Sequence, residues 1–135
     1  MKYYIRFKLN FFKGAPKLEA PAKNNSNSNT DKVVYFQTCV NRVFGQYKDS
    51  KQLPLSKSIL NLLEKAKYDV IIPNNINNSC CGMAFDSKGF TGVSQDKNTE
   101  LIKILREASD NGKYPILIDA SPCCLHLKGR SLNVN

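Results

Sequence analysis

No stretch of the 135-residue sequence holds the roughly 20 consecutive apolar residues that a membrane-spanning helix needs. Residues 1–14 also lack the unbroken apolar run of a secretory signal peptide, because charged side chains interrupt them, and no small-residue cleavage site follows. We therefore expect a soluble protein of the reducing cytoplasm. With 41% apolar and 23% charged residues, the chain suits one globular domain with a single modest core.

Two short motifs are missing from the sequence. The chain contains no C-x-x-C pair, which argues against a structural zinc knuckle and against thioredoxin-like thiol exchange, since both use that spacing. It also contains no G-x-G-x-x-G fingerprint, the glycine-rich turn that binds a flavin or another nucleotide. We therefore do not expect this chain to oxidise a substrate without a partner.

Acidic residues are scarce: there are 11, against 20 lysines and arginines, and the formal net charge is +9. Residues 1–32 hold seven basic and two acidic residues, whereas residues 33–135 hold thirteen and nine. Nucleic-acid binding by a folded domain needs basic side chains gathered on one face or along one helix. We expect no nucleic-acid partner, and interpret the charge as a solvated tail or weak attraction to an acidic partner or membrane surface.

The chain divides into a folded domain between two tails. Residues 1–32 are basic and rich in Pro, Asn and Ser, and most of this segment has too few large apolar side chains to order itself. We interpret it as a flexible tail or linker. The folded domain is placed at residues 33–130, and a short carboxyl-terminal tail at 131–135.

Apolar patterns within the domain predict three strands. Short runs rich in β-branched, aliphatic or aromatic residues occur at 33–36, 69–72 and 115–119. Runs of this length and composition are typical of strands that are buried on both faces.

Helical spacing of apolar residues predicts one helix between each pair of strands. The first covers 55–66 and follows Pro54, which suits a first helical turn, and the second is capped by Asn98 and ends at Asn111 and Gly112. The resulting β-α-β-α-β order implies right-handed crossovers and a parallel sheet. We therefore predict a small three-layer α/β fold.

Every cysteine follows a predicted strand. Cys39 lies three residues after the first strand, Cys80 and Cys81 lie in the loop after the second, and Cys123 and Cys124 follow the third. The carboxyl ends of parallel strands meet at one edge of a sheet, where binding crevices form. We therefore expect the cysteines to converge on a single site at that edge.

This set of cysteines favours metal chemistry. Five is an odd number and two pairs are vicinal, so the pattern is not a secreted disulfide framework. Thiolates are soft ligands that select zinc, copper(I) or iron–sulfur clusters. Adjacent cysteines suit one tetrahedral ion poorly but can bind different irons of one cluster. We predict an iron–sulfur site with metal ligands Cys39, Cys80, Cys81, Cys123 and Cys124; a thiol or zinc site is the alternative.

Other residues near the cysteines are weaker candidates. Gly82 and Gly89 allow tight turns whose N–H groups approach a ligand, so we predict that they contact the cofactor, although both glycines also suit ordinary turns. Arg42 is either a partner for a thiolate or a surface cation, and His126 fits an exposed loop better than a ligand. Asp119 would raise thiol pKa values, so we assign it no catalytic role.

The cysteine pattern resembles that of cysteine-rich CCG domains, in which a lone cysteine precedes Cys-Cys-Gly and then a cysteine pair at similar intervals. Here these are Cys39, Cys80-Cys81-Gly82 and Cys123, with 40 and 41 residues between successive cysteine positions.

Three blocks are similar to the large D-lactate dehydrogenases that contain flavin and iron–sulfur clusters. They are VVYFQTCVNRVFG at 33–45, INNSCCGMAFDSKGF at 76–90 and GKYPILIDASPC at 112–123. The resemblance covers residues 33–128. CCG domains also occur in glycolate and glycerol-3-phosphate dehydrogenases, in the iron–sulfur subunit of glycolate oxidase and in the B subunit of heterodisulfide reductase.

The resemblance implies that the chain is an iron–sulfur electron-transfer domain of a flavin-dependent 2-hydroxyacid dehydrogenase, relaying electrons towards a quinone or another acceptor. It implies a 4Fe-4S or non-cubane cluster, with FAD only on a partner. The implied partners are a flavin-containing dehydrogenase domain or subunit and a second CCG repeat, through which the chain is peripheral at the inner face of the membrane.

The chain departs from the family pattern at two points. Cys124 directly follows Cys123 where the family has C-x-x-C, and the second CCG repeat is missing from this sequence. The alternative interpretation is therefore a partner-binding or truncated CCG module without a competent cluster.

Overall fold

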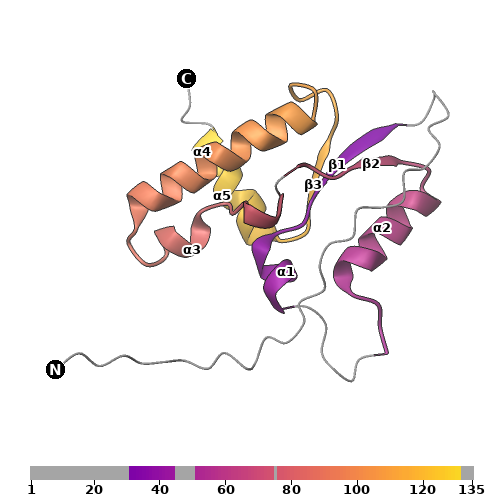
Figure 1. Cartoon of the computed structure of the whole chain (residues 1–135), viewed down its shortest axis with the longest axis horizontal. Coiled ribbons are helices and arrows are strands. Elements are labelled where there is room, and N and C mark those ends of the chain that lie inside the picture. Colours follow the sequence, from indigo (N-terminus) through magenta and orange to yellow (C-terminus); the bar gives the residue numbers. More distant parts are fainter. Residues whose placement is uncertain (1–30, 45–50, 75, 132–135) are drawn as a thin grey trace.

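The computed structural model describes residues 31–44, 51–74 and 76–131. This part of the chain forms a three-stranded parallel sheet with helices on both sides, as Figure 1 shows. The strands are β1 (Lys32–Phe36), β2 (Asp69–Ile71) and β3 (Ile116–Ile118), in the spatial order β2-β1-β3. The predicted α/β fold with a parallel sheet is therefore confirmed.

β1 is the central strand, and its sequence suits that place. Val34, Tyr35 and Phe36 are each 0% exposed, as expected for β-branched and aromatic residues in a strand covered on both faces. The first three residues of β1 pair with β2 and the last three pair with β3, where Phe36 lies opposite Ile118. β3 therefore reaches further than β2 towards the carboxyl edge of the sheet.

The helices form the outer two layers. They are α1 (Cys39–Phe44), α2 (Leu55–Lys65), α3 (Met83–Asp86), α4 (Thr91–Ala108) and α5 (Ser121–Ser131), with a short 3-10 helix η2 (Ile76–Asn78). In Figure 1, α2 lies on one side of the sheet, against β2, whereas α4 and α5 lie on the other. The predicted helix after Pro54 is thus α2.

The second predicted helix is longer than its apolar pattern indicated. α4 begins at Thr91, so the prediction that Asn98 caps this helix is wrong: Asn98 lies inside it and is only 3% exposed. The amphipathic spacing starts late because the first two turns, TGVSQDK, are mainly polar. The predicted end is confirmed, since Asn111 and Gly112 follow the helix with φ of 58° and 90°.

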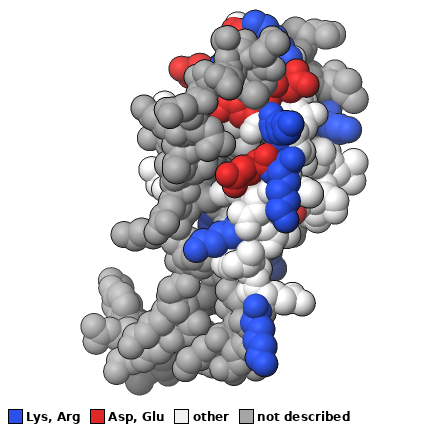
Figure 2. All heavy atoms as spheres, turned by 90° about the vertical axis from the view of Figure 1, so that its right-hand side faces the viewer, with Lys and Arg blue, Asp and Glu red and all other residues white. Residues whose placement is uncertain are grey.

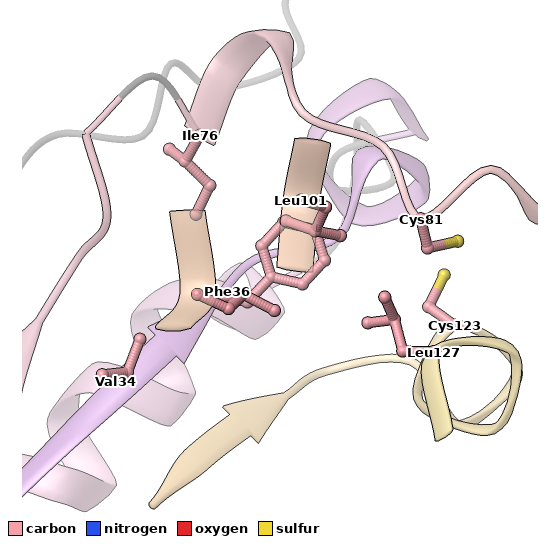
Figure 3. Packing of buried hydrophobic residues seen from close by; sticks show 8 residues of the cluster. Val34, Phe36, Ile76, Cys81, Leu101, Cys123 and Leu127 are labelled. Atoms are coloured by element: carbon pink, nitrogen blue, oxygen red, sulfur yellow. The ribbon is translucent and has the colours of Figure 1, made fainter. Parts of the chain in front are cut away.

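The core lies between the sheet and the pair α4 and α5. It contains Val34, Phe36, Ile76, Leu101, Leu105 and Leu127, together with two cysteines, Cys81 and Cys123. Figure 3 shows that these two cysteines border the apolar cluster from the side of α5. Burying a thiol in a core is common, but here the buried thiols belong to the predicted site.

Most of the amino-terminal tail predicted at residues 1–32 lies outside the described residues, as do residues 132–135 of the carboxyl-terminal tail. Lys32 belongs to β1. Within the described ranges, no helix has the length and apolar character needed to cross a membrane. On the face shown in Figure 2, Lys and Arg side chains lie among Asp and Glu side chains in the upper part of the molecule.

Candidate metal centre

Each strand is followed by a segment that carries cysteine. Cys39 is the first residue of α1, which follows β1. Cys80 and Cys81 lie between η2 and α3, in the connection that follows β2. Cys123 lies in the first turn of α5, which follows β3. Because the three strands are parallel, these segments meet at the carboxyl edge of the sheet.

The sulfur atoms of four cysteines form a continuous series of contacts. The Sγ atoms of Cys39 and Cys80 are 3.8 Å apart. Side-chain hydrogen bonds also join Cys81 to Cys80 and to Cys123, and Figure 3 shows the side chains of Cys81 and Cys123 facing each other. We call these four residues the thiol cluster. The structure thus brings all three cysteine-bearing segments together.

Hydrogen bonds within the thiol cluster create two kinds of sulfur. The hydrogen bonds with Cys39 and Cys81 lower the pKa of Cys80, and the hydrogen bond with Cys81 lowers the pKa of Cys123. The bond to Cys80 and then burial raise the pKa of Cys39, and the bonds to Cys123 and Cys80 raise that of Cys81. Cys80 and Cys123 therefore lose their protons more readily than Cys39 and Cys81, and the thiolate is the form that binds metal.

Arg42 joins α1 to the segment before Cys80. Its two terminal nitrogens donate hydrogen bonds to the backbone carbonyls of Ile76 and Ser79. Burial lowers the pKa of this guanidinium, while the nearby Cys39 and Cys80 act in the opposite direction. The sequence left two interpretations of Arg42, as a partner for a thiolate or as an ordinary surface cation. The structure favours the first.

Asp119 joins the end of β3 to the end of β1. Its carboxylate accepts hydrogen bonds from the Tyr35 hydroxyl at 3.0 Å, the Thr38 backbone N–H at 2.9 Å and the Thr38 hydroxyl at 2.7 Å. These bonds fix the residues before Cys39 against the residues before Cys123. Asp119 has a structural function that the sequence did not reveal, although its place at a strand end marked it as close to the site.

The Cys-Cys-Gly turn packs against α4. Asn98 donates its side-chain amide to the Cys81 carbonyl oxygen at 3.2 Å. Gly82 has φ of +91°, and a Cβ atom there would lie 2.3 Å from the Ser94 carbonyl oxygen, so only glycine fits this approach. The Gly82 N–H also points to Cys80 Sγ, 3.4 Å away. Gly82 thus lies beside the thiol cluster, and its contact with a cofactor stays a prediction.

The remaining predicted residues lie apart from these contacts. The Gly89 N–H donates to the Asp86 carbonyl in the turn after α3, at 2.9 Å. Cys124 lies on α5, and no sulfur contact joins it to the thiol cluster within the described residues. The interpretation of His126 as an exposed loop residue is wrong, since it lies half-buried on α5 with Nε2 3.4 Å from Ser94 Oγ.

The donor set fits an iron–sulfur cluster. In the ranges that the structure describes, no three His, Cys, Asp or Glu side chains are arranged to hold a single metal ion. The thiol cluster offers cysteine sulfurs from three segments, and cysteine sulfurs are the ligands of iron–sulfur clusters and of other soft-metal sites. Backbone N–H groups of Gly82 and Met83 bond to the sulfurs of Cys80 and Cys81, and such bonds tune cluster sites.

One comparison with known proteins finds a match. The family model described as a cysteine-rich domain, CCG, matches residues 33–128, a range that contains all five cysteines. No curated protein and no solved structure matches the chain.

Proposed function

The chain belongs to the cysteine-rich CCG domain family, and on this premise we propose that it is an iron–sulfur electron-transfer domain. The observation that carries the proposal is the thiol cluster, in which Cys39, Cys80, Cys81 and Cys123 meet from behind three parallel strands. These four residues are the proposed ligands. Cys124 is the fifth candidate, as a substitute ligand or as a neighbour of the ligands.

A bound iron–sulfur cluster accepts and releases single electrons, and this chain's own residues provide the surroundings for that chemistry. Phe36, Leu101 and Leu127 line the buried side of the site and limit access of water to it. The N–H groups that reach the sulfurs of Cys80 and Cys81 stabilise negative charge there. The proposed function of this chain is therefore to hold the cluster and to relay electrons through it.

The proposed partner is a flavin-containing dehydrogenase domain or subunit acting on D-lactate or a related 2-hydroxyacid, together with a second CCG repeat. The sequence blocks around the three cysteine positions support this assignment. Helices α3, α4 and α5 and the residue before α4 also expose large apolar side chains: Met83, Phe85, Phe90, Val93 and Leu125. Exposed apolar side chains that form a contiguous patch are typical of surfaces that bind another protein.

A zinc site is the second candidate, and the contact between Cys39 and Cys80 favours it, although no three possible ligands surround a single ion in the described part of the chain. Zinc–sulfur bonds of about 2.3 Å in a tetrahedral site place two sulfurs roughly 3.8 Å apart. The Sγ atoms of Cys39 and Cys80 lie at that separation, 3.8 Å. The same segments would then form a structural metal site within a partner-binding module that relays no electrons.

Anaerobic reconstitution with iron and sulfide separates the two candidates. We expect the wild-type chain to bind both and to gain the visible absorbance of an iron–sulfur cluster. The double variant Cys80→Ser/Cys81→Ser should bind neither, because serine removes two soft ligands. Wild-type iron content no higher than that of the double variant, together with stoichiometric zinc, would support the zinc site instead.

The need for a partner has its own assay. The chain carries no G-x-G-x-x-G fingerprint, so we expect no reduction of an artificial acceptor by D-lactate when the chain is incubated with FAD alone. D-lactate oxidation that depends on this chain and on added FAD, without any other protein, would contradict the proposal that oxidation requires a flavin-containing partner.

A further inference from the structure

Arg42 connects the helix that begins with Cys39 to the loop that carries Cys80 and Cys81. It lies on α1, one helical turn after Cys39, and its side chain is half-buried. The two terminal nitrogens hold the carbonyls of Ile76 and Ser79, and Ser79 directly precedes Cys80. The helix that begins with one cysteine is thereby fixed to the loop that carries the next two.

The third nitrogen of the guanidinium has no such partner among the described residues. The Nε atom of Arg42 is buried and makes no hydrogen bond within the described part of the chain. A buried N–H without an acceptor is unfavourable, so such groups in folded proteins generally serve a ligand, a water molecule or a functional site. The titratable groups that interact with this guanidinium are Cys39, Cys80 and Asp119.

We propose that Arg42 is a positioning and charge-compensating residue of the iron–sulfur site. Its terminal nitrogens set the distance between Cys39 and Cys80, and its positive charge, which acts on both of these cysteines, would offset the negative charge of a cluster held by them. This inference rests on the proposed function. Reduction adds one negative charge to a cluster, so a neighbouring cation stabilises the reduced form and raises the reduction potential.

Two substitutions separate the contributions of charge and geometry. Arg42→Gln removes the charge, whereas Arg42→Lys keeps it but loses the planar fork that holds two carbonyls at once. Arg106→Gln is the matched control, because Arg106 is exposed near the end of α4. Redox titration of the reconstituted chains should give a lower potential for Arg42→Gln, and a potential close to wild type for Arg42→Lys and Arg106→Gln.

The positioning function has a readout that needs no cluster. In the cluster-free protein, oxidised glutathione can take two electrons and two protons from the Cys39 and Cys80 thiols, forming one disulfide and two glutathione thiols. We expect both Arg42 variants to form this disulfide several-fold more slowly than wild type, because the loop is no longer fixed to α1. Mass spectrometry of the alkylated protein measures the rate.

Negative results in these two measurements contradict different parts of the proposal. If the wild-type chain binds no iron and sulfide, the proposed function is wrong, and the disulfide rates still decide whether Arg42 positions the thiols. If Arg42→Gln binds a cluster but its potential shifts no more than that of Arg106→Gln, the charge effect is absent. Disulfide rates equal to wild type in both Arg42 variants would overturn the positioning function.

Discussion

Asn98, buried in the middle of α4, donates its side-chain amide to the carbonyl oxygen of Cys81 across 3.2 Å. This bond holds a cysteine by its backbone and leaves the sulfur free to face the other thiols. Asn98 is thus part of the scaffold of the site, although it lies on the helix that crosses from β2 to β3.

Replacing Asn98 with alanine leaves the buried Cys81 carbonyl without this donor. We expect the free energy of unfolding to fall by about 1–3 kcal/mol, the usual effect of leaving a buried polar group unpaired. Chemical denaturation of the cluster-free protein measures the loss. Gln95→Ala is the control, because Gln95 is an exposed amide on the same helix. Equal losses of unfolding free energy in the two variants would show that the Asn98 bond does not stabilise the fold.

Gly82 and Gly89 form a matched pair for testing the close approach to α4. Both have positive φ, +91° and +81°, but only at Gly82 would a Cβ atom meet another atom, the Ser94 carbonyl oxygen at 2.3 Å. Alanine at either position is strained by about 1–2 kcal/mol. We expect Gly82→Ala to cost about 1–3 kcal/mol more, because the turn must move away from α4.

The readouts for this pair are thermal unfolding and iron content after reconstitution. Gly82→Ala should lose both stability and iron, whereas Gly89→Ala should lose only a little stability. A Gly89→Ala variant that loses as much iron as Gly82→Ala would instead support the prediction that Gly89 contacts the cofactor.

Tyr35 tests the network around Asp119. Its hydroxyl donates to the carboxylate at 3.0 Å, and burial, with Asp119 as neighbour, raises the pKa of Tyr35 so that the hydroxyl keeps its proton. Tyr35→Phe should lower the free energy of unfolding by about 1.5–3 kcal/mol, as expected for a bond to a charged group. In Tyr68→Phe, where no bond to another described residue is lost, the change should stay within about 0.5 kcal/mol.

Cys124 is distinguished from Cys81 by its contacts. Cys81 is 2% exposed and bonds to two sulfurs, whereas Cys124 is half-buried and makes no sulfur contact with the thiol cluster in the described structure. We expect Cys81→Ser to abolish cluster absorbance and Cys124→Ser to keep part of it. If Cys124→Ser loses all bound iron while Cys39→Ser keeps it, the ligands are the two vicinal pairs and Cys39 is not one of them.

The strands, and the edge at which the cysteines lie, could be predicted because they follow from local patterns. A short buried run such as VVYF at 33–36 predicts a strand, and the β-α-β-α-β order then places all strand ends at one edge. The start of α4 could not be predicted this way, since its first two turns carry almost no apolar stripe. Their helical state comes from tertiary contacts with α3.

The residues that hold the thiols in place were harder to predict, because each acts on a segment distant in the sequence. Asp119 reaches Thr38 across 81 residues, and Arg42 reaches Ser79 across 37. A bond between a side chain and a backbone N–H or carbonyl leaves no pattern in the sequence of the residue whose backbone takes part. The cysteines themselves were detectable, since thiols in this spacing have few other uses.

The central place of β1 also determines when the site can form. β1 is the first strand in the described chain, yet it pairs with both later strands, and Tyr35 meets Asp119 across 84 residues. Parallel pairing of distant segments is slow, and a chain leaves the ribosome amino terminus first. Cys39 and Cys80 therefore emerge before Cys123, so a site that needs all three segments cannot be complete until α5 has been synthesised.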